Sequence, residues 1–327
     1  MKLASYNVEN LFERTVAMNQ DTWADGKKAL ALHAEMNGIL GKTAYTNADK
    51  TRIVAIMRDL GIDKQDDGGK FAILRQNRGH LVTRTGTAIT VVADGRGDWI
   101  GWLDLKVGPV NEFAVRNTAR VINDVNADVI ALVEAESRPA LLHFGRALMP
   151  AVGGKAYDHV MLIDGNDDRG IDVAIMSKKD YRIADIRSHV DDADAQGQIF
   201  SRDCAEYGIA TLSGERLVVL VSHLKSKGFG SQATSDKKRK RQAVRTKAIY
   251  DGLRQAGETL IAVVGDFNDT PDSAPLAPLL ANTDLKDIFV HPQFNDGGRP
   301  GTFGSCAAGD KIDYILLSPE LFQKVTG

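Results

Sequence analysis

Short runs rich in valine, isoleucine and leucine recur along the chain, and they constrain its fold more than any other feature. Runs of this length and composition are typical of buried β-strands. Several follow one another with no helical pattern between them, which argues against a regularly alternating α/β barrel. A pair of mixed or antiparallel sheets with helices outside fits this order better. The runs are Lys2–Tyr6, Asp128–Val133, His159–Ile163, Ile171–Met176, Gly208–Leu212, Leu217–Ser222, Leu260–Val264 and Ile312–Leu317.

Two segments between these runs carry apolar residues at helical spacing. We predict helices over Asn111–Asn126 and over Asp236–Gln255, of which the second is strongly basic. With 327 residues, of which 43% are hydrophobic, the chain can bury a real core as one large domain or two smaller ones. We interpret it as an α/β protein with a single main domain.

Three absences set expectations about location. The sequence has no run of about 18 apolar residues that would span a membrane, and Met1–Tyr6 does not resemble the start of a signal peptide. Cys204 and Cys306 are too few for a disulfide scaffold or a cysteine-based zinc site. We therefore expect a reduced, cytoplasmic setting, while the oligomeric state stays open.

The stretch from about Asn19 to Val110 differs from the rest, and we interpret it as an inserted α/β segment or subdomain. The turn Asp94–Asp98 predicts that the two strands beside it pair as a hairpin. We interpret Trp99 and Trp102 as its local core, with a stacking platform for bases as the alternative. The predicted helices and strands are Trp23–Leu40, Asn47–Leu60, Phe71–Leu74, Ala88–Ala93 and Asp98–Leu105, with a polar linker Lys64–Lys70.

Polar side chains gather where four of the predicted strands end. Because side chains alternate between the two faces of a strand, residues two positions apart point the same way. Glu134 closes one strand, and the pairs that close the others are Asn7 with Glu9, His223 with Lys225, and Asp266 with Asn268. Any one of them could be a simple strand cap, but together they favour a polar site on a rigid scaffold.

The chemistry of this set favours phosphate ester hydrolysis. Glu134, Glu9 and Asp266 are hard oxygen ligands, which suit Mg²⁺ or Mn²⁺ better than zinc or copper. Lys225, Arg202 and Arg169 could neutralise an anionic substrate. The sequence has no GxxxxGK[ST] loop, no GxSxG elbow and no HExxH helix, so three common classes of nucleotide-binding protein and hydrolase are excluded.

At these same residues the sequence resembles the endonuclease/exonuclease/phosphatase superfamily, which has the DNase I-like fold, and within it a bacterial-type nuclease branch. The motifs occur in the family's order and cover most of the chain outside residues 19–110. They are SYNVENLF (5–12), DVIALVEAE (128–136), RGIDVAIMS (169–177), IFSRDC (199–204), VSHLKSKGFG (221–230), VVGDFNDTP (263–271) and KIDYILLS (311–318).

The resemblance implies a four-layer sandwich, in which two mixed β-sheets pack face to face between helices. It also implies roles for individual residues. Glu134 is similar to the family's principal metal ligand, with Asn7 beside it and Glu9 as a further ligand or a supporting carboxylate. Asp266 resembles the residue that activates water, and Asn268 its partner on the scissile phosphate. His223 and Arg202 resemble phosphate-contacting residues, and Asp313 resembles the aspartate that orients a catalytic histidine.

The chain departs from the family at its end. The family's last strand follows a Ser-Asp-His motif, whereas this sequence stops at Gly327, soon after Asp313. His291 precedes that aspartate and lies in a predicted loop. We expect either a lost C-terminal strand or impaired catalysis, because loss of one member of such a unit costs orders of magnitude in rate.

The basic helix and three smaller features leave alternatives open. Lys238 and Lys240 could follow a nucleic-acid backbone, or could belong to an ordinary solvated helix face. Asp167 and Asp168 are interpreted as turn residues. Glu136 competes with Glu134 for the metal, and strand register favours Glu134. Cys204 is expected to be a small buried hydrophobic residue.

The first hypothesis is a hydrolase with Mg²⁺ or Mn²⁺ that cleaves a nucleic acid, DNA rather than RNA, by in-line attack of water. A phosphatase or a phospholipid phosphodiesterase on the same scaffold is the second, because a fold does not fix a substrate. The third is a catalytically weak nucleic-acid-binding module.

Overall fold

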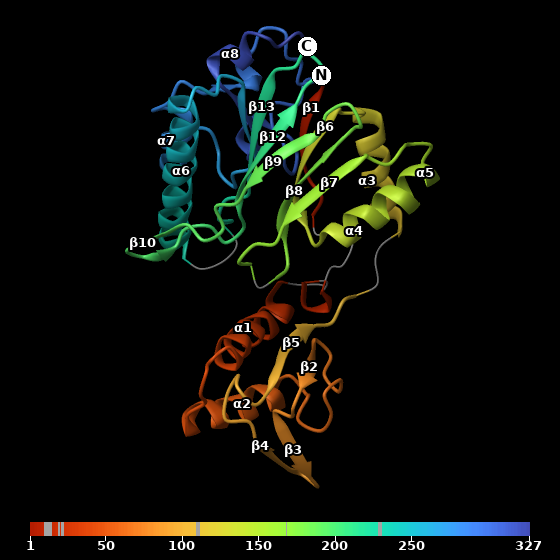
Figure 1. The fold of residues 1–327 in the computed structure, drawn as a ribbon, viewed down its shortest axis with the longest axis vertical. Helices are drawn as coiled ribbons and strands as arrows, with labels where there is room; N and C mark the ends of the chain where they lie inside the picture. The colour runs from red at the N-terminus through yellow and green to blue at the C-terminus, as the bar shows by residue number, and fades with distance from the viewer. Residues whose placement is uncertain (10–14, 19, 21–22, 109–111, 168, 228–230) are drawn as a thin grey trace. The chain divides into compact units, whose positions relative to one another are not determined.

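Figure 1 shows the computed structural model of the chain, which describes residues 1–9, 15–18, 20, 23–108, 112–167, 169–227 and 231–327. The chain divides into two compact units, one made of Met1–Phe12 and Asn111–Gly327 and the other of Glu13–Val110. The second unit contains the whole stretch interpreted as an insertion. Among the described helices, none is long and apolar enough to cross a membrane.

The first unit contains a four-stranded mixed sheet with the order β1-β6-β8-β7. β1 lies parallel to β6, and the other two pairs are antiparallel. β6 is buried at almost every position, as expected for a central strand that is covered on both faces. The bounds are β1 Leu3–Asn7, β6 Val129–Ala135, β7 His159–Ile163 and β8 Asp172–Ser177.

A second, six-stranded sheet has the order β15-β16-β14-β13-β12-β9. β13 and β14 are parallel, and the other neighbours are antiparallel. The bounds are β9 Ile183–Arg187, β12 Cys204–Ala210, β13 Arg216–Ser222, β14 Ile261–Asp266, β15 Lys286–Asp287 and β16 Asp313–Leu317.

The two sheets pack face to face through alternate residues of their strands. Val133 and Val173 of the first sheet share one core cluster with Val219 and Val264 of the second. Each fully buried aliphatic side chain of this kind stabilises the fold by about 1.5–3 kcal/mol.

Helices cover the outer face of each sheet. Ile122 and Leu141, from α3 and α4, pack on the four-stranded sheet, and Tyr250 and Leu279, from α6 and α7, pack on the six-stranded one (Figure 1). This arrangement confirms the predicted four-layer sandwich. The helices are α3 Glu112–Val125, α4 Arg138–His143, α5 Met149–Ala151, α6 Gln232–Gln255, α7 Ala277–Leu280 and α8 Pro319–Phe322.

Several element boundaries differ from the sequence prediction. α6 begins at Gln232, before the basic run, because the Ser231 side chain accepts a hydrogen bond from the Thr234 backbone and caps the helix. β9 was not predicted, because an edge strand with mostly exposed residues lacks an apolar pattern. The remaining short elements of the first unit are the π-helical turn Phe144–Leu148, the 3₁₀ turns Ala274–Leu276, Ile288–Val290 and Ala308–Asp310, and the small hairpin of β10 Ala193–Asp194 and β11 Gly197–Gln198.

The second unit has its own core of helices and paired strands. Met36, Ile53, Trp99 and Leu103 are fully buried in it. Its elements are the 3₁₀ turn Val16–Met18, α1 Trp23–Leu40, α2 Asn47–Asp59, β2 Ala72–Arg78, β3 Val82–Thr85, β4 Ala88–Val91 and β5 Ile100–Leu105.

The hairpin predicted across Asp94–Asp98 is wrong. β4 pairs with β3, and β5 pairs with β2. The turn is instead closed on itself, because the Asp98 side chain accepts hydrogen bonds from the backbones of Asp94 and Gly95. It also packs against the segment before α2, where the Tyr45 backbone donates to the Asp94 carbonyl oxygen.

The two tryptophans of this unit behave differently. Trp99 is fully buried, as predicted for local core, whereas Trp102 is 45% exposed and the core interpretation is wrong for it. The physical reason is strand alternation, since Trp102 lies between the buried Gly101 and Leu103 and therefore points to the other face.

Candidate active site

Three of the predicted site residues lie on strained backbone at strand ends. Glu9, Glu134 and Asn268 have φ values of 54°, 63° and 56°, which residues other than glycine rarely adopt. At Glu134 a bulge interrupts the pairing of β6 with β8, between Val133 and Ala135. Such a conformation costs about 1–3 kcal/mol per residue and is concentrated at functional sites. The strained backbone therefore indicates that the direction of these side chains serves function, at a cost in the stability of the fold.

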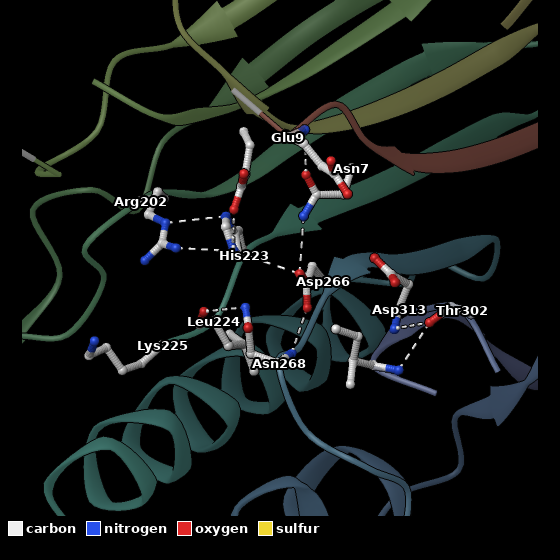
Figure 2. A network of polar contacts seen from close by, with 12 residues as sticks. Asn7, Glu9, Arg202, His223, Leu224, Lys225, Asp266, Asn268, Thr302 and Asp313 are labelled. Atoms are coloured by element: carbon white, nitrogen blue, oxygen red, sulfur yellow. Dashed lines mark hydrogen bonds and ion pairs between the residues drawn. The ribbon is translucent and has the colours of Figure 1, made fainter. Parts of the chain in front are cut away.

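One hydrogen bond joins the polar ends of the two sheets. The Asn7 side chain, at the end of β1, donates from Nδ2 to Asp266 Oδ2 over 3.2 Å (Figure 2). The Asn268 backbone donates to the other carboxylate oxygen, Oδ1, over 2.7 Å, and the Asn268 side chain donates to the Leu224 carbonyl oxygen. Both oxygens of Asp266 are thus held in fixed directions. Glu9 joins this group through its backbone, which donates to Asn7 Oδ1 over 2.8 Å, while its side chain is exposed.

His223 is buried between an arginine and two carboxylates. Its Nδ1 and Nε2 lie 3.2 and 3.0 Å from Nε and Nη2 of Arg202 (Figure 2). Its Nε2 also lies 3.8 Å from Glu134 Oε1 and 3.9 Å from Asp266 Oδ2. Burial, together with the charges of Arg202 and Arg169, holds the pKa of His223 well below its usual value, so the ring is neutral.

A neutral imidazole has one acceptor nitrogen, and arginine can only donate. Arg202 has a donor within hydrogen-bond distance of each ring nitrogen, and the neutral ring can accept from only one of them. In the tautomer in which Nδ1 accepts, Nε2 carries the proton and faces Glu134 and Asp266. In that tautomer His223 is suited to donate a hydrogen bond from Nε2 toward a substrate oxygen between these carboxylates.

Asp167 is a site residue that the sequence interpretation missed. Its interpretation as a turn residue is confirmed, because the Gly170 backbone donates to the Asp167 carbonyl oxygen over 2.8 Å. In addition, its carboxylate accepts two hydrogen bonds from Arg169, of 2.7 and 2.6 Å, and lies 3.4 Å from Arg202 Nη1. Burial alone would raise the pKa of Asp167, but the hydrogen bond from Arg169 and the charges of Arg202 and Arg169 outweigh it, and the pKa is lowered. The signal in the sequence was the Asp-x-Arg spacing, which is too common to identify alone. Asp168 lies outside the described residues.

The predicted basic residues separate into two groups. Lys225 is half-buried in the site, where burial and the charges of Arg169 and Arg202 lower its pKa to about 8. Lys238 is also half-buried, and its pKa is lowered by burial and by the charge of Arg202. Lys240 is exposed and is not brought into this group.

The carboxylates of the site repel one another. Asp266 and Asp313 lie directly opposite each other on β14 and β16. Burial, and then the charge of Asp313, raises the pKa of Asp266, and burial followed by the charge of Glu134 raises that of Asp313. Burial raises the pKa of Glu134 as well, against the charges of Arg202 and Arg169 and a hydrogen bond from Asn7. A cation at this point would relieve the repulsion.

These side chains suit a six-coordinate ion that prefers oxygen ligands and keeps several waters. They suit less well a metal for which protein side chains must supply every ligand. Across the part of the chain that the structure describes, no group of three or more His, Cys, Asp or Glu side chains is placed to hold a metal by itself. Mg²⁺ does not need one, because it keeps several waters and is commonly bound through one or two carboxylates. Glu134, with the Asn7 amide beside it, meets that requirement.

Asp313 is placed by its strand and by one threonine. The Thr302 hydroxyl accepts hydrogen bonds from the backbones of Ile312 and Asp313, each 3.0 Å long. Among the contacts of the described residues, none joins Asp313 to a histidine, so its expected role beside a catalytic histidine stays a prediction.

The repulsion between these carboxylates has a measurable consequence for stability. The folded-state pKa of Asp313 lies above that of an unfolded chain, so its contribution to stability is present at low pH and is lost as the pH rises through the raised value. We expect Asp313→Asn, without divalent metal, to raise the unfolding midpoint at pH 8 by about 2–4 °C. The gain should shrink toward pH 4. Thermal unfolding at both pH values measures it, with the exposed Asp191→Asn as control; an unchanged or lower midpoint at pH 8 would contradict it.

Comparison of the sequence with known families gives one result. Residues 75–327 match the sequence profile of the Endonuclease/Exonuclease/phosphatase family. The match covers more than half of the chain and includes the strands that carry Glu134, His223, Asp266 and Asp313. Comparison with curated proteins found no match.

Several solved structures align with part of this chain at low sequence identity. The human Nocturnin catalytic domain with bound sulfate is 14% identical, with a TM-score of 0.48 over 64% of this chain and 77% of that one. A mannosyl-6-phosphatase from Bacteroides thetaiotaomicron is 16% identical, with a TM-score of 0.44 over 63% and 76%. Truncated TDP2 from Caenorhabditis elegans is 14% identical, with a TM-score of 0.43 over 62% and 75%.

Proposed function

The chain belongs to the endonuclease/exonuclease/phosphatase family, whose members hydrolyse phosphoester bonds, and we propose that it is a divalent-metal-dependent phosphodiesterase that cleaves DNA. The observation that carries this proposal is the junction of the two sheets. There the Asn7 side chain bonds Asp266, and His223 Nε2 lies within 3.9 Å of both Glu134 and Asp266. Two carboxylates and an imidazole thus lie close together, and this supports roles as metal ligand for Glu134, as general base for Asp266 and as hydrogen-bond donor for His223.

Asp266 is the residue best placed to accept a proton from the attacking water. Its two oxygens are oriented by Asn268 and Asn7, and its raised pKa brings its basicity closer to neutral pH. Fixed orientation matters because in-line attack at phosphorus requires the water on the side opposite the leaving oxygen.

His223 and Arg202 act on the phosphoryl group. In the tautomer with its proton on Nε2, neutral His223 can donate to a non-bridging oxygen, and the contacts of Arg202 with both ring nitrogens fix the orientation of the ring. Lys225 adds positive charge at the same end of the site, as does Arg169. Donors fixed in advance cost no reorganisation when charge develops. When bound at Glu134 and Asn7, Mg²⁺ or Mn²⁺ supplies Lewis-acid stabilisation of that charge.

Arg202, Lys225 and Arg169 place several positive charges at the site, and these charges favour a substrate that carries several negative charges. A phosphatase is the second candidate, because these cations are concentrated at one point instead of spread along a surface, which also suits the dianion of a phosphomonoester. The glutamate, aspartate and histidine would serve either substrate.

A substrate panel tests the proposal. We expect Mg²⁺-dependent cleavage of duplex or single-stranded DNA, exceeding turnover of RNA, of a phospholipid and of p-nitrophenyl phosphate. The control is each reaction with EDTA in place of Mg²⁺. Faster turnover of the monoester than of DNA would favour the phosphatase, and no turnover of any substrate with Mg²⁺ or Mn²⁺ would overturn enzymatic function.

A further inference from the structure

Two loops of the six-stranded sheet carry site residues, and hydrogen bonds tie these loops to each other. The His223 loop (223–227) follows β13, and the Asn268 loop (267–270) follows β14. The Leu224 backbone donates to the Asp266 carbonyl oxygen over 2.9 Å, and the Asn268 side chain donates to the Leu224 carbonyl oxygen over 3.1 Å (Figure 2). The position of His223 relative to Asp266 therefore depends on how the two loops are held together.

One buried arginine of α6 connects both loops to the helix. Arg239 is fully buried, and its Nε donates to Asp269 Oδ2 over 2.9 Å, while its Nη1 donates to the Lys225 carbonyl oxygen over 2.6 Å. Its Nη2 also binds Asp236 of the same helix. Three residues further along α6, Gln242 accepts a hydrogen bond from the Lys225 backbone over 2.7 Å. Arg239 thus bridges the two loops from below.

Asp269 is the point at which the Asn268 loop is anchored. Besides its bond from Arg239, its carboxylate lies 2.6 Å from Lys227 Nζ, and its carbonyl oxygen accepts from the Tyr314 hydroxyl over 2.8 Å. Burial alone would raise the pKa of Asp269, but the hydrogen bond from Lys227 and the charge of Arg239 outweigh it, and the pKa is lowered. Asp269 is therefore held as an anion, directly after Asn268.

This anchor lies next to strained backbone. Asn268 has a φ of 56°, and a residue other than glycine keeps such a conformation only where its surroundings impose it. The strand β14 fixes the chain before Asn268, and Asp269 fixes it afterwards. In this conformation the Asn268 backbone donates to Asp266 Oδ1 over 2.7 Å. If the anchor were released, the backbone could relax and this hydrogen bond would be lost.

A buried ion pair adds little net stability, because the cost of desolvating both charges offsets their attraction, but it can specify one arrangement. Arginine suits this purpose, since its planar fork directs several donors at once. We propose that Arg239 is a positioning residue that joins Asp269 to the carbonyl oxygen of Lys225 and so holds the two loops in one arrangement. The Asn268 loop then keeps its strained conformation, and Asp266 keeps its direction in the site. This inference rests on the proposed function, in which Asp266 accepts a proton from water.

Arg239→Lys tests the proposal, because lysine keeps the buried charge but cannot donate to both loops in the fixed directions of a guanidinium. With an oligodeoxynucleotide and Mg²⁺, we expect kcat to fall about 10- to 100-fold and KM to change by less than about 2-fold, since misplacement of a catalytic group affects the chemical step. Tyr250→Phe is the matched control. Tyr250 is also fully buried on α6, but its hydroxyl donates to Asp284, outside both loops. This control should lower the unfolding midpoint and leave kcat unchanged.

Amide hydrogen exchange, followed by NMR, tests the proposal without relying on activity. In Arg239→Lys the Asn268 backbone amide should exchange about 10-fold faster relative to that of Val263, in the centre of β14, because the loop opens locally while the sheet does not. Asp269→Asn keeps the size of the side chain but weakens the anchor, and it should change exchange in the same direction. It provides the test if Arg239→Lys does not fold.

The two measurements separate failure of this inference from failure of the proposed function. If the wild-type protein cleaves no DNA but exchange at Asn268 rises in the variants, the positioning role stands and the proposed function falls. Unchanged exchange at Asn268 in folded Arg239→Lys or Asp269→Asn would overturn the positioning role. So would a loss of kcat in Tyr250→Phe as large as that in Arg239→Lys.

Discussion

Asp266→Asn is expected to lower kcat for DNA cleavage by about 10³-fold, the effect typical of losing a positioned general base. The variant keeps the size of the side chain and one acceptor oxygen, so it retains one of the hydrogen bonds from Asn7 and Asn268. It loses the other hydrogen bond and the basicity that a raised pKa provides. It also removes a buried charge opposite Asp313, so the fold should be retained. Plasmid cleavage at saturating Mg²⁺ measures the rate, and circular dichroism checks the fold.

The pH profile makes this prediction specific. Activity of the wild-type protein should fall as the pH drops through the raised pKa of Asp266, because the protonated carboxyl cannot accept a proton. The residual activity of Asp266→Asn should not show this fall as the pH drops. The exposed Asp272→Asn, six residues away, is the control and should keep the wild-type profile. Undiminished cleavage by Asp266→Asn at neutral pH would remove Asp266 from its assigned role.

Glu134→Gln is the second large effect, and here we expect loss of metal-dependent activity by about 10³-fold or more, since a metal ion contributes several kcal/mol to the transition state. Glutamine has almost the same size as glutamate, and a φ of 63° costs both residues the same conformational energy. The change therefore removes charge without altering shape. In the wild-type protein Mg²⁺ or Mn²⁺ should raise the unfolding midpoint by mass action, and in Glu134→Gln this rise should be lost or greatly reduced.

Glu136→Gln is the matched control, because the sequence alone left both glutamates as candidates. It should retain the metal-induced rise in midpoint and most of the activity. If Glu136→Gln loses the metal response and Glu134→Gln keeps it, the metal site is assigned to the wrong glutamate.

Much of the candidate site could be predicted from the sequence, because its residues follow apolar strands directly. Asn7, Glu134, His223 and Asp266 each come at or just after the end of a buried run, so their positions along the chain and their shared edge could be inferred together. Asp167 could not, since it lies in a loop and its role depends on Arg202, which is 35 residues further along the chain. Lys238 and Lys240 looked equivalent in the sequence, and only packing of α6 against Lys225 distinguishes them.

The hairpin prediction failed for a related reason. Asp94–Asp98 has the composition of a tight turn between strands, but turn residues specify a local bend and not which strands pair. The hydrogen bonds of Asp98 close that bend, and the partner of β5 is β2, which lies far earlier in the sequence. Pairing between distant strands depends on side-chain packing across the whole core.

The sequence by itself determined most of the long buried strands, the two-sheet architecture and the residue types at the strand ends, because hydrophobic periodicity and motif order are local properties. Only the tertiary structure decided which charges meet. It placed Arg202 against His223, shared Asp167 between two arginines, set Asp266 opposite Asp313, and left Lys238 half-buried and Lys240 exposed. Electrostatic interaction depends on distance and burial, and neither is a property of position along the chain.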